Sequence, residues 1–168
     1  MRSTYKGRYK VKKPEKYEGD ISTVTYRSSW EKFCFLWAER NSSVIKWSSE
    51  EVVIPYLYEA DRKWHRYFMD LKLIMEDGRT ILVEIKPKSQ TMPPKVPQRK
   101  TKKYLDESFT FIKNQNKWDA AREYCADRGW SFEIWTEDVL SSMGMKMTKS
   151  TSKKKITPLK PLPRKKKK

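Results

Sequence analysis

The chain has 168 residues, a formal net charge of +17 and a sequence pI of about 9.8. This length predicts one domain with tails, and the excess of positive charge predicts a polyanionic partner, most simply nucleic acid. There is no run of about 18 apolar residues, no apolar leader, and only two distant cysteines with one histidine, so we expect no membrane span, no signal segment and no zinc site of the usual spacing.

Residues 1–20 are predicted to form a basic arm outside the folded domain. They contain seven Lys or Arg against three Asp or Glu, and their apolar residues follow neither a helix nor a strand period. Tyr5, Tyr9 and Tyr17 alternate with the basic residues, which suits stacking on DNA bases. A solvated, flexible arm fits the same pattern equally well.

A helix is predicted to begin at Ser28 and to end near Asn41. Its apolar face is formed by residues at helical spacing, namely Trp30, Phe33, Cys34 and Trp37. Ser28 and Glu31 have the spacing of a capping box, in which the glutamate reaches back to the start of the helix. As a cap, Glu31 needs no further function. Beside the apolar face of the first turn, it could instead point into a site under the sheet.

Two short extended pieces are expected after this helix, at 44–47 and 52–54. Residues 64–68 are then predicted to lead directly into a strand that carries Asp70. Because side chains alternate along a strand, Arg66 is expected on the face of Asp70, where it could contact a phosphate.

Residues 68–86 are predicted to form a hairpin of two mostly apolar strands. Asp70 lies on the first strand, and Glu84 and Lys86 lie on the second. Ionised groups are costly in such a setting unless they are paired or bind a metal. These three charged residues therefore call for a function.

The length of the hairpin loop decides whether these charges meet. A two-residue loop would turn Asp70 and Glu84 to opposite faces of the sheet. A three-residue loop at 76–78, with Gly78 in the left-handed region, would place Asp70 opposite Glu84 and Lys86 on the same face. We predict the three-residue loop.

Two opposed carboxylates suit a hard divalent cation such as Mg²⁺, which takes oxygen ligands and contacts substrate phosphates. Such an ion can acidify a bound water and neutralise charge that develops on a phosphate. Lys86 could orient the attacking water or stabilise the pentavalent transition state. The alternative is a half-exposed hairpin with ordinary surface charges. The apolar strands argue against it, because strands of this composition are normally buried.

Residues 87–103 contain four prolines, six Lys or Arg and no acid, so we expect a loop that leaves the end of the Glu84 strand. Lys88 and the other basic residues of this loop are placed to follow a phosphate backbone. A disordered surface linker fits the composition equally well.

The remaining elements are predicted as a weak helix at 104–112, a better helix from 114 or 116 to 128, a strand at 130–136 and a short helix at 137–142. A helix followed by a returning strand predicts an α/β (α+β) fold, in which a mixed sheet has that strand parallel to its neighbour.

The folded domain is expected to span 21–142. Residues 143–168 contain eleven Lys or Arg and no acid, and are predicted to form a disordered Lys-rich tail that adds non-specific affinity for DNA or docks on an acidic protein surface.

A glutamate on a helix, a hairpin with Asp and then Glu-x-Lys, and a following helix and strand resemble the PD-(D/E)xK nuclease superfamily. Met69 replaces the proline that often precedes the aspartate. The runs TYRSSWEKF, VVIPY, HRYFMD, VEIKPKSQ and KWDAAREYCADRGWSFEIWTED are similar to the head-completion nucleases of T-even-like tailed phages. They are also similar to the endonuclease subunits of heteromeric cut-and-paste transposases, and the resemblance covers about 26–138.

This resemblance implies a restriction-endonuclease-like mixed β-sheet flanked by helices, and it assigns catalytic roles to four residues. Asp70, Glu84 and the backbone carbonyl of Ile85 would bind Mg²⁺ or Mn²⁺. Lys86 would position the water, and Glu31 would complete the site through water or a second ion.

The resemblance also implies that Lys117 and Trp118 provide an additional contact to DNA. The implied function is a metal-dependent DNA endonuclease that trims DNA during completion of a phage head, in the virion or the host cytoplasm, with capsid or portal proteins as partners. Two alternatives are a non-catalytic basic DNA-binding head plug or connector, and a repair or recombination nuclease that acts on branched DNA.

Overall fold

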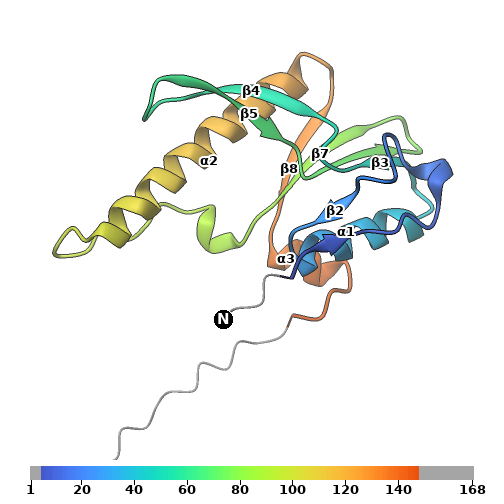
Figure 1. Cartoon of the computed structure of the whole chain (residues 1–168), viewed down its shortest axis with the longest axis horizontal. Helices are drawn as coiled ribbons and strands as arrows, with labels where there is room; N and C mark the ends of the chain where they lie inside the picture. The colour runs from blue at the N-terminus through green and yellow to red at the C-terminus, as the bar shows by residue number, and fades with distance from the viewer. Residues whose placement is uncertain (1–4, 148–168) are drawn as a thin grey trace, which may run out of the picture.

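The computed structural model describes residues 5–147, which form a four-stranded sheet, two small two-stranded sheets and three α-helices (Figure 1). The elements in chain order are β1 (Gly7–Arg8), η1 (Pro14–Lys16), β2 (Thr25–Tyr26), α1 (Ser29–Arg40), β3 (Val44–Ser48), β4 (Val53–Tyr58), β5 (Lys63–Phe68), β6 (Leu71–Met75), β7 (Thr80–Ile85), η2 (Lys88–Gln90), α2 (Lys102–Ala126), β8 (Ser131–Trp135) and α3 (Glu137–Ser142). In this part of the chain, no helix combines the length and apolarity needed to cross a membrane.

The central sheet has the strand order β3-β6-β7-β8. β3, β6 and β7 are antiparallel neighbours, whereas β8 returns parallel to β7 after α2. The mixed sheet with a parallel returning strand is therefore confirmed. β7 lies between two strands and is covered on both faces, so Leu82 and Val83 are fully buried on opposite sides of the sheet.

The β6–β7 hairpin has the predicted three-residue loop. The N–H of Met75 donates to the carbonyl of Arg79 at 2.8 Å, and residues 76–78 lie outside that pair. Gly78 has a φ of 86°, a backbone conformation that glycine adopts without strain. Leu71 consequently pairs with Val83, and this register continues to Asp70 opposite Glu84.

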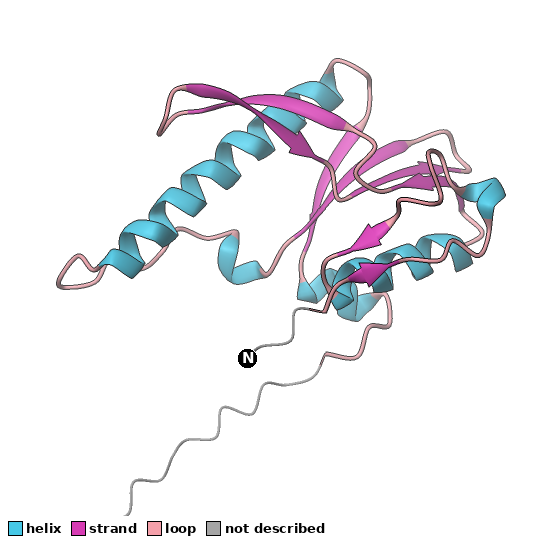
Figure 2. Ribbon diagram, in the orientation of Figure 1, coloured by secondary structure: helices cyan, strands magenta, loops and turns pink. Residues whose placement is uncertain are grey.

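The chain bends between β5 and β6, contrary to the continuous strand expected through Asp70. β5 pairs with β4 in a separate two-stranded sheet that lies beside α2 (Figure 2). The N–H and the carbonyl of Met69 bond to Val52 and Glu50, which holds the chain at the bend. Because the register is broken at this point, the alternation from Asp70 does not extend to Arg66.

The N-terminal segment is part of the folded domain rather than an arm outside it. Tyr9, Val11 and Tyr17 are buried against α1 and β3, where Tyr9 and Tyr17 pack edge-on against Trp47. The buried Glu39 carboxylate accepts hydrogen bonds from the Tyr9 hydroxyl and the Lys12 N–H, each at 2.7 Å. The folded domain therefore does not begin at residue 21, because large aromatic side chains of this N-terminal segment complete the core.

α2 is one continuous helix, although two pieces were expected at 104–112 and 114–128. It begins after Thr101, whose side chain accepts the N–H of Tyr104, and it contains neither proline nor glycine. Its second half packs on one face of the sheet through Trp118, Ala121 and Cys125. The first half exposes most of its side chains, which is why its apolar period is weak.

The C-terminal segment extends the core past α3. Met143, Met145 and Met147 pack against the cluster that includes α1, so the described part of the expected tail belongs to the fold. The remaining residues of that tail, 148–168, lie outside the described part of the chain.

Candidate active site

Asp70, Glu84 and Lys86 lie together at the start of β6 and the end of β7. The Lys86 Nζ is 2.9 Å from Oε1 of Glu84, whose side chain is only 3% exposed. The backbone N–H of Ile85 donates to Oδ2 of Asp70 at 2.8 Å. The hairpin register therefore brings the two acids and the lysine into one partly buried cluster, as the loop length predicted.

Tyr67 is a member of this cluster that the sequence did not reveal. Its hydroxyl donates to Oε2 of Glu84 at 2.6 Å, and its side chain is buried. Both oxygens of Glu84 are therefore held, one by a phenol and one by an ammonium group. Tyr67 faces the site because of the bend after β5, and no local sequence pattern signalled that bend.

The carboxyl group of Asp70 is strongly perturbed. Burial raises its pKa well above the usual value, and the negative charges of Glu84 and then Glu31 raise it further, whereas the Ile85 N–H and Lys86 act in the opposite direction. Two acids that share a buried site resist simultaneous ionisation, so a bound cation is the natural counterion.

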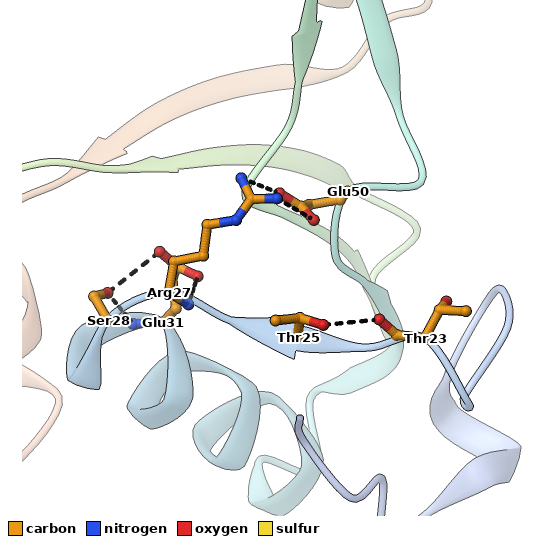
Figure 3. A network of polar contacts seen from close by, with 6 residues as sticks. All are labelled: Thr23, Thr25, Arg27, Ser28, Glu31 and Glu50. Atoms are coloured by element: carbon orange, nitrogen blue, oxygen red, sulfur yellow. Dashed lines mark hydrogen bonds and ion pairs between the residues drawn. The ribbon is translucent and has the colours of Figure 1, made fainter. Parts of the chain in front are cut away.

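Glu31 caps α1 and also lies near this cluster. Oε2 of Glu31 accepts the N–H of Arg27 at 2.7 Å, and Oε1 accepts the Ser28 hydroxyl at 3.3 Å (Figure 3). The Glu31 N–H in turn donates to the Ser28 hydroxyl at 3.1 Å, which confirms the predicted capping box.

The buried Cys34, on the following turn of α1, lies near both Glu31 and Asp70. Burial raises the pKa of the Cys34 thiol, and the charges of Asp70 and Glu31 raise it further. Both acids therefore lie close to the same side of α1. Glu31 is itself half-buried, and this burial raises the pKa of its carboxyl group. Capping and proximity to the site thus coexist in one side chain.

An ion pair fixes the entrance to α1. The Arg27 guanidinium contacts both carboxylate oxygens of Glu50, at 2.8 and 3.2 Å, which joins the start of α1 to the turn after β3 (Figure 3). Glu50 has a φ of 59°, and its N–H donates to the carbonyl of Met69, next to Asp70. The segment that carries Glu31 and the segment that carries Asp70 are thereby connected through a single residue.

Lys117 approaches the site from α2. Its ammonium group lies over the rings of Tyr67 and Tyr56, with 5.1 and 5.9 Å to the ring centroids. Burial lowers the pKa of Lys117, the neighbouring Lys86 and Lys113 lower it further, and Glu84 opposes them. The position expected for an additional positive contact is thus occupied by a half-buried lysine beside the cluster.

Trp118 does not have the exposure that a direct DNA contact requires. Its side chain is 2% exposed, in the cluster between α2, β4 and β8. Adjacent residues on a helix point in different directions, so Lys117 faces the site while Trp118 faces the core. The expectation that Trp118 touches DNA is therefore corrected to a packing role.

Arg66 and Lys88 also differ from their expected placement. Since Tyr67 faces Glu84, the neighbouring Arg66 lies on the opposite side of β5, where it is exposed and stacks over Phe68 at 5.4 Å. Lys88 is exposed but paired with Asp138 of α3 at 2.8 Å. Neither residue contacts the acidic cluster directly, and their contacts to DNA stay predictions.

The residues of the cluster fit a divalent cation by their chemistry. Within residues 5–147, no three His, Cys, Asp or Glu side chains are arranged as a ready-made metal site. However, the buried Glu84 and the half-buried Asp70 offer carboxylate oxygens side by side, and the charge of Glu84 makes ionisation of Asp70 more costly. Oxygen donors of this kind match Mg²⁺ or Mn²⁺. The carbonyl of Ile85 remains a predicted ligand.

Comparison with known proteins gives two matches. Residues 41–137 match a family model described as TnsA-like endonuclease N terminal. Over 146 residues, which are 84% of this chain and 97% of the relative, the chain is 42% identical to the head completion nuclease of Enterobacteria phage T4. The family match spans Asp70, Glu84, Lys86 and Lys117, and it begins after Glu31.

Proposed function

We propose that this chain, which belongs to the TnsA-like endonuclease N-terminal family, is a DNA endonuclease that depends on a divalent cation and acts in the completion of a phage head. The observation that carries the proposal is the partly buried convergence of Asp70, Glu84 and Lys86, with both Glu84 oxygens held by hydrogen bonds. The family match and the related head completion nuclease support the reaction class and the biological setting.

Asp70, Glu84 and the Ile85 carbonyl would hold Mg²⁺ or Mn²⁺, and Glu31 would take part through water or a second ion. When bound, the cation supplies neutralisation of phosphate charge and a more acidic water. Tyr67 and Lys86 orient the Glu84 carboxylate, so that its direction is set before DNA arrives.

Lys86 acts as a cation and a hydrogen-bond donor in this proposal. Burial lowers its pKa, but the charge and hydrogen bond of Glu84, together with the charges of Asp70 and Glu31, outweigh burial, so the pKa of Lys86 is raised overall. A lysine that stays protonated at neutral pH does not act as a general base. It orients the attacking water and offsets negative charge on the pentavalent phosphate.

The basic surface around the cluster is proposed to hold double-stranded DNA. Lys117 lies beside the site, and the loop at 87–101, which leaves β7, carries Lys95, Arg99 and Lys100 with exposed side chains. These groups would neutralise backbone phosphates without reading sequence. Contacts with capsid or portal proteins, and a place in the virion, belong to the same proposal.

Two alternatives have weaker support. A non-catalytic head plug or connector would have no need for two acids in a buried cluster with a lysine. A repair or recombination nuclease on branched DNA would share the cluster, but the related head completion nuclease favours DNA processing at the phage head.

Plasmid cleavage tests the proposal. Supercoiled plasmid is incubated with wild type, Asp70→Ala and Lys86→Ala, each in Mg²⁺, Mn²⁺ and EDTA. We expect wild type to nick or cut the plasmid with either cation and not in EDTA, and each variant to lose at least about 10²-fold in rate. Equal activity in all three proteins, or undiminished cleavage in EDTA, would refute the proposed chemistry.

A further inference from the structure

A cavity of about 460 Å³ lies between the loop after η2 and the first half of α2, outside the acidic cluster. Its volume falls in the range of pockets that bind small ligands, about 300–1,000 Å³. Asp70, Glu84 and Lys86 do not line this cavity. We refer to it as the side pocket.

The side pocket has an apolar wall. Phe111 of α2 lines the cavity together with Met92 and Pro94 of the loop, and Met92 is 62% exposed. An aromatic ring with apolar neighbours offers a surface on which a flat ring can stack. In DNA-binding proteins, stacking of one base on an aromatic side chain is worth about 1–3 kcal/mol.

Asn114 adds a hydrogen-bonding group to the same pocket. It lines the cavity, its side chain is 95% buried, and its amide nitrogen has no hydrogen-bond partner within residues 5–147. A buried amide without a partner costs about 1–3 kcal/mol, which a ligand with a complementary edge would recover once the Asn114 side chain turns its amide into the cavity. Asparagine amides form such bonds with the edges of bases.

Two carboxylates argue against a phosphate as the occupant. Asp106 and Glu107 line the pocket with exposed side chains, and Glu107 is only loosely paired with Lys103 at 3.7 Å. Carboxylates repel a phosphate but accept hydrogen bonds from the amino groups of a base. The pocket therefore fits a flat, neutral ligand that has donors and acceptors on its edge.

The side pocket is adjacent to the proposed path of DNA. Asn114 precedes Lys117 by three residues on α2, which places it on the same side of the helix about one turn away. Ser89 and Gln90, on the other side of the pocket, follow Lys86 by only a few residues. DNA held at the acidic cluster by Lys117 would pass the opening of the pocket.

We propose that the side pocket receives an unpaired base of the DNA substrate, stacked on Phe111 and hydrogen-bonded to Asn114. This inference rests on the proposed endonuclease function and adds to it a preference for DNA with an unpaired nucleotide near the scissile phosphate. A base within a duplex cannot enter, because its edge is paired and its faces are stacked.

Binding measured without cleavage tests the inference separately from catalysis. Fluorescence anisotropy in EDTA compares a labelled duplex with the same duplex carrying one bulged adenine. We expect wild type to bind the bulged DNA about tenfold more tightly, which corresponds to stacking and one amide contact. Asn114→Leu, which keeps the side-chain size, should bring the ratio of affinities close to one, and Phe111→Ala should do the same.

Gln115→Leu is the matched control, because Gln115 is the next residue of α2, does not line the pocket, and should keep the wild-type ratio. Equal affinity of wild type for the two DNAs would overturn the inference. So would a bulge preference that survives in both pocket variants. A failure of the proposed nuclease function would appear instead as intact binding preference without cleavage in Mg²⁺.

Discussion

Asp70 is the residue at which function and stability oppose each other. Its carboxylate is a ligand of the proposed cation site but is costly in the folded protein, since burial and the charge of Glu84 both raise its pKa. Asp70→Asn removes that charge and should raise the melting temperature in EDTA by about 2–4 °C while abolishing cleavage. Differential scanning fluorimetry measures the first effect, and a lower melting temperature for the variant would contradict it.

The raised pKa of Asp70 also makes the stability of the folded protein depend on pH. A carboxyl group whose pKa is higher in the folded state makes that state bind more protons than the unfolded chain, so stability falls as pH rises between the two pKa values. In EDTA, wild type should therefore gain stability relative to Asp70→Asn as pH is lowered from about 8 to about 5. If the melting temperatures of the two proteins changed equally with pH over this range, the pKa of Asp70 would not be raised in the folded protein.

Tyr67 should act as a positioning residue for Glu84. Tyr67→Phe leaves Oε2 of Glu84 without its phenol donor and should weaken divalent-cation affinity and lower the cleavage rate by about tenfold. Tyr56→Phe is the matched control, because Tyr56 is equally buried and its hydroxyl makes no hydrogen bond within the described residues. A cation half-saturation concentration unchanged from wild type in Tyr67→Phe would assign the residue a packing role only.

At the scale of elements, the N-terminal turn of α1 combines a cap with a site residue, and two substitutions separate these roles. Ser28→Ala removes the cap acceptor of the Glu31 N–H and should cost about 1 kcal/mol of stability. Glu31→Gln keeps an oxygen acceptor for the Arg27 N–H but removes the charge. We therefore expect this substitution to affect the cleavage rate more than the free energy of unfolding. Urea unfolding and plasmid cleavage of both variants provide the comparison. If Glu31→Gln and Ser28→Ala cleaved DNA at equal rates, Glu31 would have a capping role and no role in cleavage.

The elements also show where sequence reasoning succeeds. The loop at 76–78 could be predicted because a glycine at its third position suits a left-handed backbone, and this one loop fixes the partner of Asp70. The bend at Met69 could not be predicted, because it depends on backbone bonds to Val52 and Glu50, which are distant along the chain. The sequence therefore predicts Arg66 on the face of Asp70, whereas the structure places Tyr67 there.

The length of α2 and the role of the first twenty residues needed the whole fold. The first half of α2 is mostly exposed, so its apolar spacing is weak even though nothing interrupts the helix. The basic neighbours of Tyr9 and Tyr17 suit either base stacking or a solvated arm, but the structure packs both rings against Trp47 in the core. The basic composition of residues 1–20 suits a DNA partner, whereas the packing of their tyrosines shows that the segment belongs to the core.

For the whole molecule, the net charge of +17 should make DNA binding strongly dependent on salt. Replacing Lys95 and Lys100 by Gln should reduce the slope of log K against log salt by about 2, if both neutralise phosphates. The same charge change at Arg62 and Lys63, at the end of the β4–β5 hairpin, is the control. If the two double variants gave equal slopes, the loop at 87–101 would not contact the DNA phosphates.

The convergence of Asp70, Glu84 and Lys86 around a divalent cation is tested most directly by a Mn²⁺ titration in which electron paramagnetic resonance measures the free ion. Wild type is predicted to bind Mn²⁺ in a site that Asp70→Asn loses, with Asn114→Leu as a control that retains it. Identical binding by wild type and Asp70→Asn, or no bound Mn²⁺ in wild type at saturating concentration, would contradict the account.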